Sequence, residues 1–252
     1  MSEKLTREQV EHLVKSARLH IQRPNLIKVD LSEADLEAID LIGANLSGAF
    51  LERTNLSQAL FSEANLIGAR LNGADLSGAD LSEALLSGAK LAAANLSGAF
   101  LSEVSLNSAK LPQANLSGAK LAAANLSGAD LTEANLQQAD LRLAYLRWAD
   151  LSRANLAGAN FSEANLNAAH LIDANMSGAD FHGAYLRWAN LHGVDLRRAN
   201  LKGANLSETD LRGANLSEID LKETNLQDAK YNRATIWPAN FDPTQVGAIQ
   251  EG

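Results

Sequence analysis

The chain has 252 residues, a net charge of −8, only 5% aromatic residues and no cysteine. The absence of cysteine excludes disulfides and thiolate metal sites and leads us to expect a cytoplasmic protein. The sequence has no run of about 18 apolar residues that could form a membrane-spanning helix. The charge is uneven, with 6 basic and 3 acidic side chains in residues 1–29 but 5 basic and 13 acidic ones in residues 30–139, which argues against nucleic acid as a partner.

The first predicted element is an amphipathic helix from residue 7 to about residue 20. Thr6 and Gln9 have the spacing of a capping box, and apolar side chains then recur at helical spacing at Val10, Leu13, Val14 and Ala17. So narrow a stripe suits a helix that covers the end of a neighbouring structure. The alternative is a helix that binds a membrane or a partner, because the segment is basic. We favour the former and assign residues 1–23 to an N-terminal capping helix.

From residue 24 to residue 236 one five-residue pattern repeats without a change of phase. Every position that ends in 1 or 6, from Leu26 to Ile236, is Leu, Phe, Met, Tyr or Ile, and from Val29 to Ala234 the position two before it is Ala, Val, Ile or Thr. A period of five fits neither a helix nor a flat strand, and a strict short repeat is typical of a solenoid. We expect these two positions to point inward and the other three to face solvent.

Each unit is predicted to be a short strand followed by a turn. Before the C-terminal tail every glycine lies two positions after the central apolar residue, which indicates a positive φ at the third residue of a type II turn. Pro112 lies one position earlier, where such a turn accepts proline. The Asn or Asp before the central Leu is a residue type that bonds turn backbone.

Units such as Ala114-Asn115-Leu116-Ser117-Gly118 follow the pattern A-[D/N]-L-x-x, and over roughly 200 residues the chain resembles the pentapeptide-repeat family. The ending Trp237-Pro238-x-x-Phe241-Asp242-Pro243 is similar to that of cyanobacterial members. The resemblance implies an all-β solenoid, a right-handed quadrilateral (four-sided) parallel β-helix with four units per coil and about ten coils spaced roughly 4.8 Å apart.

Four units per coil would stack residues twenty apart, and most of the resulting columns are uniform. One column of Asn and Asp is interpreted as structural: Asp35, Asn55, Asp75, Asn95, Asn115, Asn135, Asn155, Asn175, Asp195 and Asn215. Two charged columns, Glu63 with Glu83 and Glu103 and Arg70 with Lys90 and Lys110, are interpreted as solvated surface. The alternative for these two is a docking stripe for a charged partner.

The strongest departure from the repeat is a duplicated segment. Residues 144–149, Ala-Tyr-Leu-Arg-Trp-Ala, recur as residues 184–189, two coils later on the same face and about 10 Å away. Trp, Tyr and Arg are enriched in binding hot spots, so the segment predicts a partner-binding site. Its candidate residues are Tyr145, Arg147, Trp148, Tyr185, Arg187 and Trp188. The alternatives are a lateral cation–π patch without a partner, or a duplication without a role.

Residues 237–252 are assigned to a C-terminal cap or tail. Asp242 before Pro243 suits the start of a short helix that runs to about Ala248. We interpret the tail as a lid, which favours a monomer. The alternative is a C-terminal homodimer interface.

The sequence points to a binding role. No nucleophile–base pair or glycine-rich phosphate loop stands out, and His170, His182 and His192 are not expected to share a metal. We therefore predict a protein that is not an enzyme, holds no cofactor and acts as a rigid scaffold for an unknown protein partner, without nucleic acid or membrane. The alternative, known for some pentapeptide-repeat proteins, is a DNA mimic that protects a type II topoisomerase (gyrase); the acidity and the rod fit it, but interrupting loops are missing.

Overall fold

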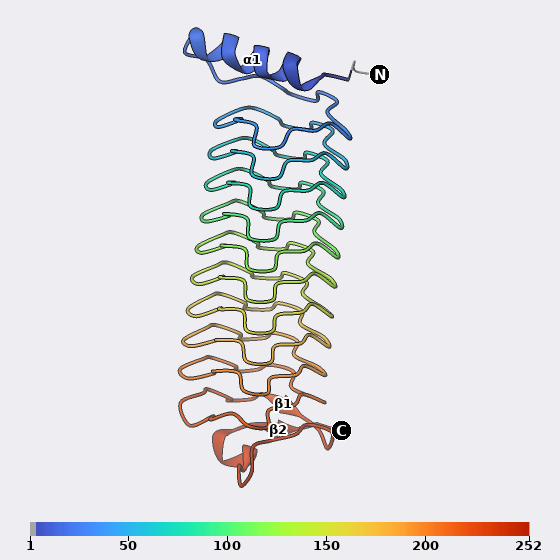
Figure 1. The fold of residues 1–252 in the computed structure, drawn as a ribbon. Coiled ribbons are helices and arrows are strands. Elements are labelled where there is room, and N and C mark those ends of the chain that lie inside the picture. Colours follow the sequence, from blue (N-terminus) through green and yellow to red (C-terminus); the bar gives the residue numbers. More distant parts are fainter. Residues whose placement is uncertain (1–3, 252) are drawn as a thin grey trace.

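The computed structural model describes residues 4–251 as a straight stack of coils with a helix across one end (Figure 1). The helix is α1 (Arg7–Leu19), and two short strands, β1 (Lys230–Tyr231) and β2 (Ile249–Gln250), lie at the other end with the 3-10 helix η1 (Pro243–Val246) between them in sequence. In the described part of the chain, no helix is long and apolar enough to cross a membrane.

The coils are held together by parallel pairing between residues twenty apart. Bridges join Asp75 to Asn95 and Asn95 to Asn115, and three other columns repeat the same spacing. Within one such link the Leu76 N–H donates to the Asn95 carbonyl over 2.7 Å, and the Asn95 N–H donates back to Ala74 over 2.9 Å. Each five-residue unit thus contributes one bridging position, and four units complete a coil.

The turns have the predicted geometry. Within one unit the Ala79 N–H donates to the Leu76 carbonyl over 3.0 Å, and Gly78, the third residue of the turn, has φ 64°. Glu83 occupies the same position in the next unit with φ 59°. The Asp75 carboxylate accepts the Ser77 N–H over 3.0 Å. A positive φ is therefore a property of the position, whichever residue occupies it, as a type II turn requires.

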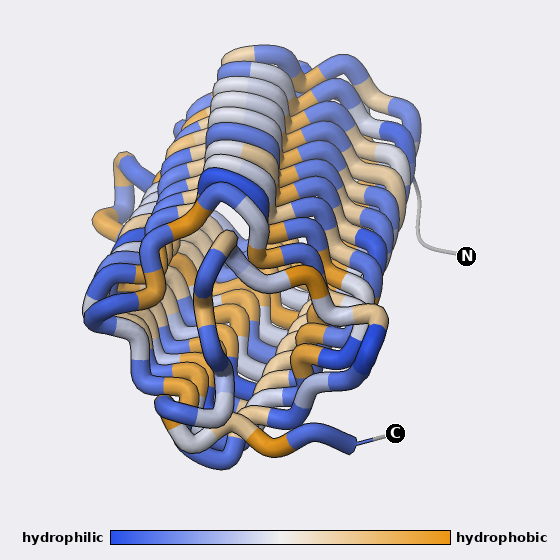
Figure 2. The backbone as a smooth tube through the Cα atoms, turned by 90° about the horizontal axis from the view of Figure 1, so that it is seen from below, coloured by the Kyte–Doolittle hydropathy of each residue, from blue (hydrophilic) through white to orange (hydrophobic). Residues whose placement is uncertain are grey.

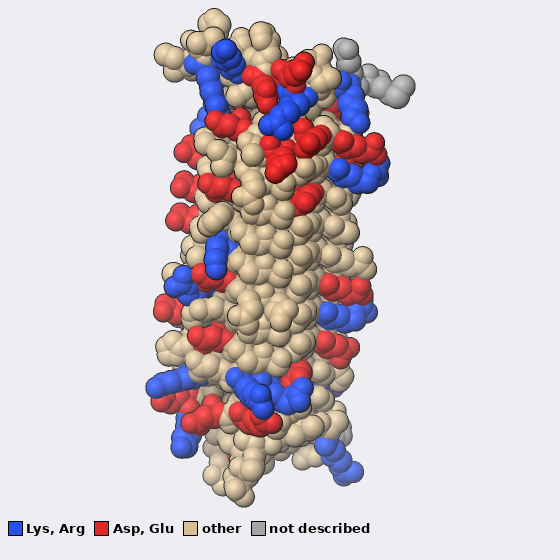
Figure 3. Space-filling model, viewed as in Figure 1, with Lys and Arg blue, Asp and Glu red and all other residues tan. Residues whose placement is uncertain are grey.

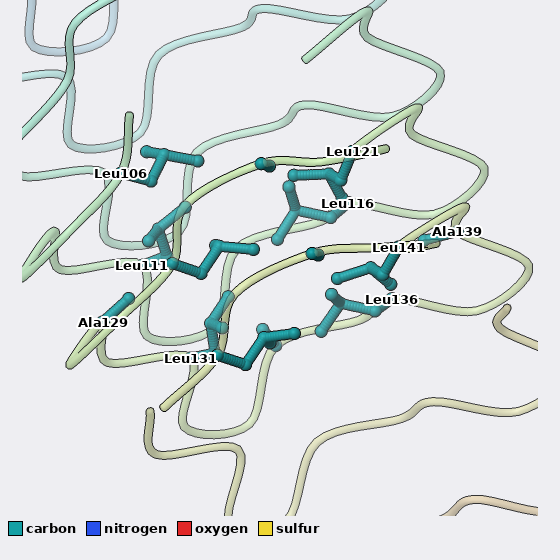
Figure 4. Packing of buried hydrophobic residues seen from close by; sticks show 14 of the residues in the cluster. Leu106, Leu111, Leu116, Leu121, Ala129, Leu131, Leu136, Ala139 and Leu141 are labelled. Atoms are coloured by element: carbon teal, nitrogen blue, oxygen red, sulfur yellow. The ribbon is translucent and has the colours of Figure 1, made fainter. Parts of the chain in front are cut away.

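The two inward positions form a continuous apolar column. Nearly all of their Leu and Ala side chains, such as Leu116 and Ala114, are fully buried. Figure 4 shows Leu111 and Leu131 from successive coils pointing into the interior at matching positions, and Figure 2 shows residues of like hydropathy lined up coil after coil. Phe161 and Phe181 stack in this column with ring centroids 5.0 Å apart. Burial of each Leu contributes about 1.5–3 kcal/mol.

The predicted Asn and Asp column is a ladder of side-chain hydrogen bonds. The Asn135 amide donates to the Asn115 oxygen over 3.2 Å, and the Asn155 amide donates to Asn135 over 3.1 Å. Each oxygen also accepts a turn N–H, as Asn135 does from Gln137 over 3.2 Å. The interpretation of this face as structural agrees with these contacts.

The helix α1 begins at the predicted capping box, in which the Thr6 N–H donates to the Gln9 side chain over 2.7 Å and the Gln9 N–H to the Thr6 hydroxyl over 3.3 Å. Val10 and Val14 are buried against the first coil. Leu13, which the helical pattern placed on the same stripe, is 42% exposed. The orientation of the helix on the coil leaves this side chain outside the contact.

The repeat does not stay in phase to Ile236. The Leu211 N–H donates to Lys230, nineteen residues on, but the Leu216 N–H donates to Ile236, twenty residues on. One extra residue therefore follows β1, and Thr235 instead of Ala234 turns inward. Ile236, expected inside, is 51% exposed.

Aromatic side chains and the tail close this end of the stack. Trp237 packs edge-on against Tyr231 and stacks on Phe241, with centroids 5.4 and 5.3 Å away. The tail then returns as β2, which pairs with β1 in parallel. The expected helix after Asp242 is present as η1, which ends at Val246 rather than near Ala248.

Candidate functional site

The six residues of the duplicated segment lie along one edge of the stack, and we call them the aromatic patch: Tyr145, Arg147, Trp148, Tyr185, Arg187 and Trp188. Tyr145 and Tyr185 belong to one bridge column, with Asn165 paired to both of them. In each copy the Arg and Trp form the turn that follows the Tyr. We call residues 145, 147 and 148 the first unit, and residues 185, 187 and 188 the second unit.

The aromatic rings of the patch face solvent. Trp148 is 59% exposed, Trp188 50%, and both tyrosines 53%. Two coils separate the units, which corresponds to about 10 Å. The sequence prediction that the copies share one face is therefore confirmed by the bridges, and the patch is an exposed surface of four aromatic side chains.

Both tryptophans occupy the turn position with positive φ, at 57° for Trp148 and 61° for Trp188. A left-handed conformation costs a side-chain-bearing residue about 1–2 kcal/mol relative to the ordinary one. Their backbone N–H groups donate to carbonyl oxygens of the next coil over 3.3 Å, whereas the backbone N–H of Ala168, at the same turn position in the coil between them, donates over 2.9 Å. Tryptophan therefore stands where glycine would fit the backbone better.

Each arginine stacks on the tryptophan that follows it. The guanidinium carbon of Arg147 lies 4.3 Å from the centroid of the Trp148 ring, and that of Arg187 lies 4.0 Å from the Trp188 ring. At this distance the cation is attracted by the electron-rich ring face. In both units the arginine guanidinium thus stacks on the tryptophan ring in the same way.

A neighbour that distinguishes the second unit from the first is Glu208, which sequence reasoning missed. One of its oxygens accepts from the Arg187 guanidinium over 3.0 and 2.6 Å, and the other accepts from the Trp188 indole N–H over 2.9 Å. These hydrogen bonds from Arg187 and Trp188 lower the pKa of the Glu208 carboxyl. The signal was present in the sequence, because residue 208 follows Trp188 by one coil.

The first unit has no such neighbour. Ala168 follows Trp148 by one coil, and in residues 4–251 neither the Arg147 guanidinium nor the Trp148 indole N–H has a hydrogen-bond or ion-pair partner. Between the units, the side-chain oxygen of Asn167 is buried and accepts no hydrogen bond. The side-chain hydrogen-bond donors of Arg147 and Trp148 are thus not used within residues 4–251.

In the basic column of Arg70, Lys90 and Lys110, two of the three cations lie near a carboxylate, unlike the Arg147 guanidinium. Arg70 pairs with Glu52 over 2.5 Å, and Lys110 lies 3.9 Å from Asp130. Figure 3 shows basic and acidic side chains intermixed along the edges and near both ends of the stack. Among the described residues, no three His, Asp or Glu side chains converge in a way that could hold a metal ion.

Comparisons with known proteins agree with this architecture. The model of the family described as pentapeptide repeats matches residues 25–58, 59–98, 84–121, 113–147, 149–187 and 189–228. No match was found among curated proteins.

A similar solved structure supports the same assignment. The crystal structure of HetL from the cyanobacterium Nostoc sp. strain PCC 7120, a pentapeptide-repeat protein involved in heterocyst differentiation regulation, is 38% identical, covers 88% of this chain and 97% of its own, and has a TM-score of 0.83. QnrB1, a plasmid-mediated fluoroquinolone resistance protein, is 17% identical over 88% of this chain and 89% of its own, with a TM-score of 0.34. Pentapeptide-repeat proteins form right-handed quadrilateral β-helices. The chain belongs to the pentapeptide-repeat family.

Proposed function

We propose that this protein is a non-enzymatic cytoplasmic scaffold, and that it binds a protein partner through the aromatic patch. The body would be a right-handed, four-sided β-helix of about ten coils, with α1 as its N-terminal cap and the tail as a lid that keeps it monomeric. A stack whose coils are locked on both sides presents its surface with little loss of backbone conformational entropy on binding.

The observation that carries the proposal is the exposure of Trp148 and Trp188 at turn positions with positive φ. Glycine fits this backbone better than tryptophan, so the turn geometry does not account for the aromatic side chains there. Exposed Trp and Tyr beside Arg are the composition of interface hot spots. HetL, similar along nearly its whole length, is described as involved in regulation, and a regulatory binding role for this chain is consistent with that.

The test is affinity capture from the source cell with three baits: the wild type, the double variant Trp148→Ala/Trp188→Ala and the control Phe100→Ala. Phe100 is 53% exposed but lies outside the patch, so its removal also takes away exposed aromatic surface. We expect the double variant to keep its melting temperature and lose a partner that Phe100→Ala retains. A full set of partners on the double variant would refute the proposal.

A supercoiling assay with gyrase and a quinolone distinguishes the scaffold from the DNA mimic. A scaffold leaves gyrase activity and its inhibition unchanged at every concentration of the protein. Protection of gyrase that survives in the Trp148→Ala/Trp188→Ala variant would replace the scaffold proposal by mimicry.

A further inference from the structure

The second unit shows what the Arg–Trp pair binds. Glu208 uses both of its oxygens there, one toward the Arg187 guanidinium and one toward the Trp188 indole N–H. Hydrogen bonds from a cation to a carboxylate are about twice as strong as neutral ones. Three donors thus converge on one carboxylate at the edge of the stack.

We propose that the first unit, Arg147 and Trp148, is an open receptor for an acidic side chain of the protein partner, and that Glu208 occupies the equivalent receptor from within the chain. The proposal rests on the proposed function and specifies the chemistry of its site. The partner would present a Glu or Asp carboxylate to Arg147 and Trp148.

The chain itself leaves the first receptor open. The residues one coil before and one coil after Trp148 are Gly128 and Ala168, and neither carries a polar side chain. Ala168 holds the position that Glu208 holds in the second unit. The turn accepts glutamate at this position, since Glu163 has φ 58° and Glu208 φ 57° there. Alanine at 168 is therefore not imposed by the backbone.

The open receptor is already formed. Arg147 stacks on Trp148 at 4.3 Å without any carboxylate, close to the 4.0 Å of the occupied pair. Its ligand therefore does not have to order the guanidinium, which lowers the entropic cost of binding.

The uncompensated positive charge of Arg147 favours an anionic ligand at the first unit. Arg187 is neutralised by Glu208 at 2.6 Å, whereas Arg147 has no carboxylate within 4.0 Å in residues 4–251. A cation stacked on an exposed ring attracts an anion, and the tryptophan and tyrosine surfaces supply apolar contact around it. An acidic residue in an otherwise apolar protein segment matches both features.

The direct test follows the indole N–H resonances by NMR, which are few because the chain has three Trp. The full-length protein is titrated with acetyl-tetraglutamate amide and, as the control, with acetyl-tetraglutamine amide at the same ionic strength. We expect the Trp148 resonance to move downfield with the glutamate peptide alone, toward the position of Trp188, while Trp188 stays in place. Equal responses to both peptides, or none, would overturn the proposal.

Three variants test whether the carboxylate at this turn position decides which unit is open. Ala168→Glu supplies the missing carboxylate, so we expect it to weaken binding of the glutamate peptide by about tenfold or more, whereas Ala168→Gln does not. Glu208→Gln removes the internal ligand, so the Trp188 resonance begins to respond to the peptide. Binding that is unchanged in Ala168→Glu contradicts the receptor.

The captured partner separates this inference from the proposed function. Loss of the partner in both Trp148→Ala/Trp188→Ala and Ala168→Glu supports the scaffold and the receptor. Loss in the double variant alone leaves the scaffold and overturns the receptor. Retention in the double variant overturns the scaffold itself, while the peptide titration still decides whether the first unit binds carboxylates.

Discussion

The middle of the stack and its C-terminal end achieve burial by different means. In the middle, Leu and Ala fill identical positions and every coil pairs with two neighbours. At the end, the phase changes after Tyr231, and the partly buried Trp237 packs against the core together with Tyr231 and Phe241. A coil with one neighbour lacks half of the pairing that fixes its register, so large aromatic side chains and β2 take over this role.

The last coils also separate along one face. Asn160, Asp180 and Asn200 pair in one column, but Asn200 does not pair with Asp220. The Gly203 N–H donates to Glu223 instead of the residue before it, and a hollow of about 380 Å³ opens there. Regularity is therefore a cooperative property of neighbouring coils and weakens toward the end.

The largest effect is expected in the middle, where Leu116→Arg places a charge in the apolar column. Leu116 is fully buried, and a buried unpaired charge costs several kcal/mol. We expect loss of the single cooperative transition in thermal unfolding followed by circular dichroism. Glu103→Arg is the control, because Glu103 is exposed. Equal melting temperatures for the wild type and Leu116→Arg would contradict the buried column.

The end is probed by a pair of adjacent variants, Trp237→Ala and Ile236→Ala. We expect Trp237→Ala to destabilise the end by about 3 kcal/mol, because it removes the ring that packs on Tyr231 and Phe241. Hydrogen exchange should show lost protection in β1 and β2 with the middle coils unchanged. Ile236→Ala should have little effect, and the opposite order would mean that the repeat stays in phase to residue 236.

This register change marks a limit of prediction from sequence. The inward positions were predictable because five-residue spacing and side-chain size agree over the stack up to β1, and the glycine position revealed the positive φ. Ile236 has the residue type and the number that the pattern demands, yet Thr235 is buried and its hydroxyl donates to the Leu211 carbonyl over 2.9 Å. The sequence does not reveal the one extra residue after β1, because Ala234 and Ile236 still fit the five-residue pattern.

The site was predictable in part for a similar reason. The duplicated residues could be placed on one face because spacing by forty is a multiple of the coil. The difference between the units could not be seen from the duplication, since it lies in Ala168 and Glu208, outside both copies. The exposure of Leu13 depends on how α1 lies on the first coil, and helical spacing contains no information about that.

A smaller effect is expected for the side-chain ladder of the middle. Asn135→Ala removes one amide donor to Asn115 and one acceptor for Asn155, as well as the bond to its own turn. Asn125→Ala on another face removes the equivalent turn bond, from the Ser127 N–H over 3.0 Å, without a ladder. We expect the first variant to be less stable than the second by about 1–2 kcal/mol in urea unfolding. Equal stabilities would show that the ladder does not stabilise the stack.

The smallest effect is expected at the N-terminal end, where Arg18 of α1 holds Asp40 of the first coil. The guanidinium donates to both carboxylate oxygens over 2.7 and 2.5 Å, and these hydrogen bonds lower the pKa of Asp40. Both side chains are nearly half exposed, so we expect a contribution of about 0.5 kcal/mol. With its pKa lowered by folding, Asp40 stabilises the helix above the ordinary aspartate pKa of about 3.9, and this stabilisation is lost as the pH falls through the lower folded value.

Hydrogen exchange of α1 in the wild type and in Asp40→Asn measures this contribution at each pH. Protection should be slightly higher in the wild type at about pH 6, and the difference should shrink as the pH falls through the lowered pKa of Asp40 and the carboxylate becomes protonated. The same comparison made in a middle coil should show no difference, because Asp40 contacts only the end of the stack. A difference that persists at low pH would mean that Asp40 acts through packing rather than charge, and that the two ends of this molecule are closed by the same kind of contact.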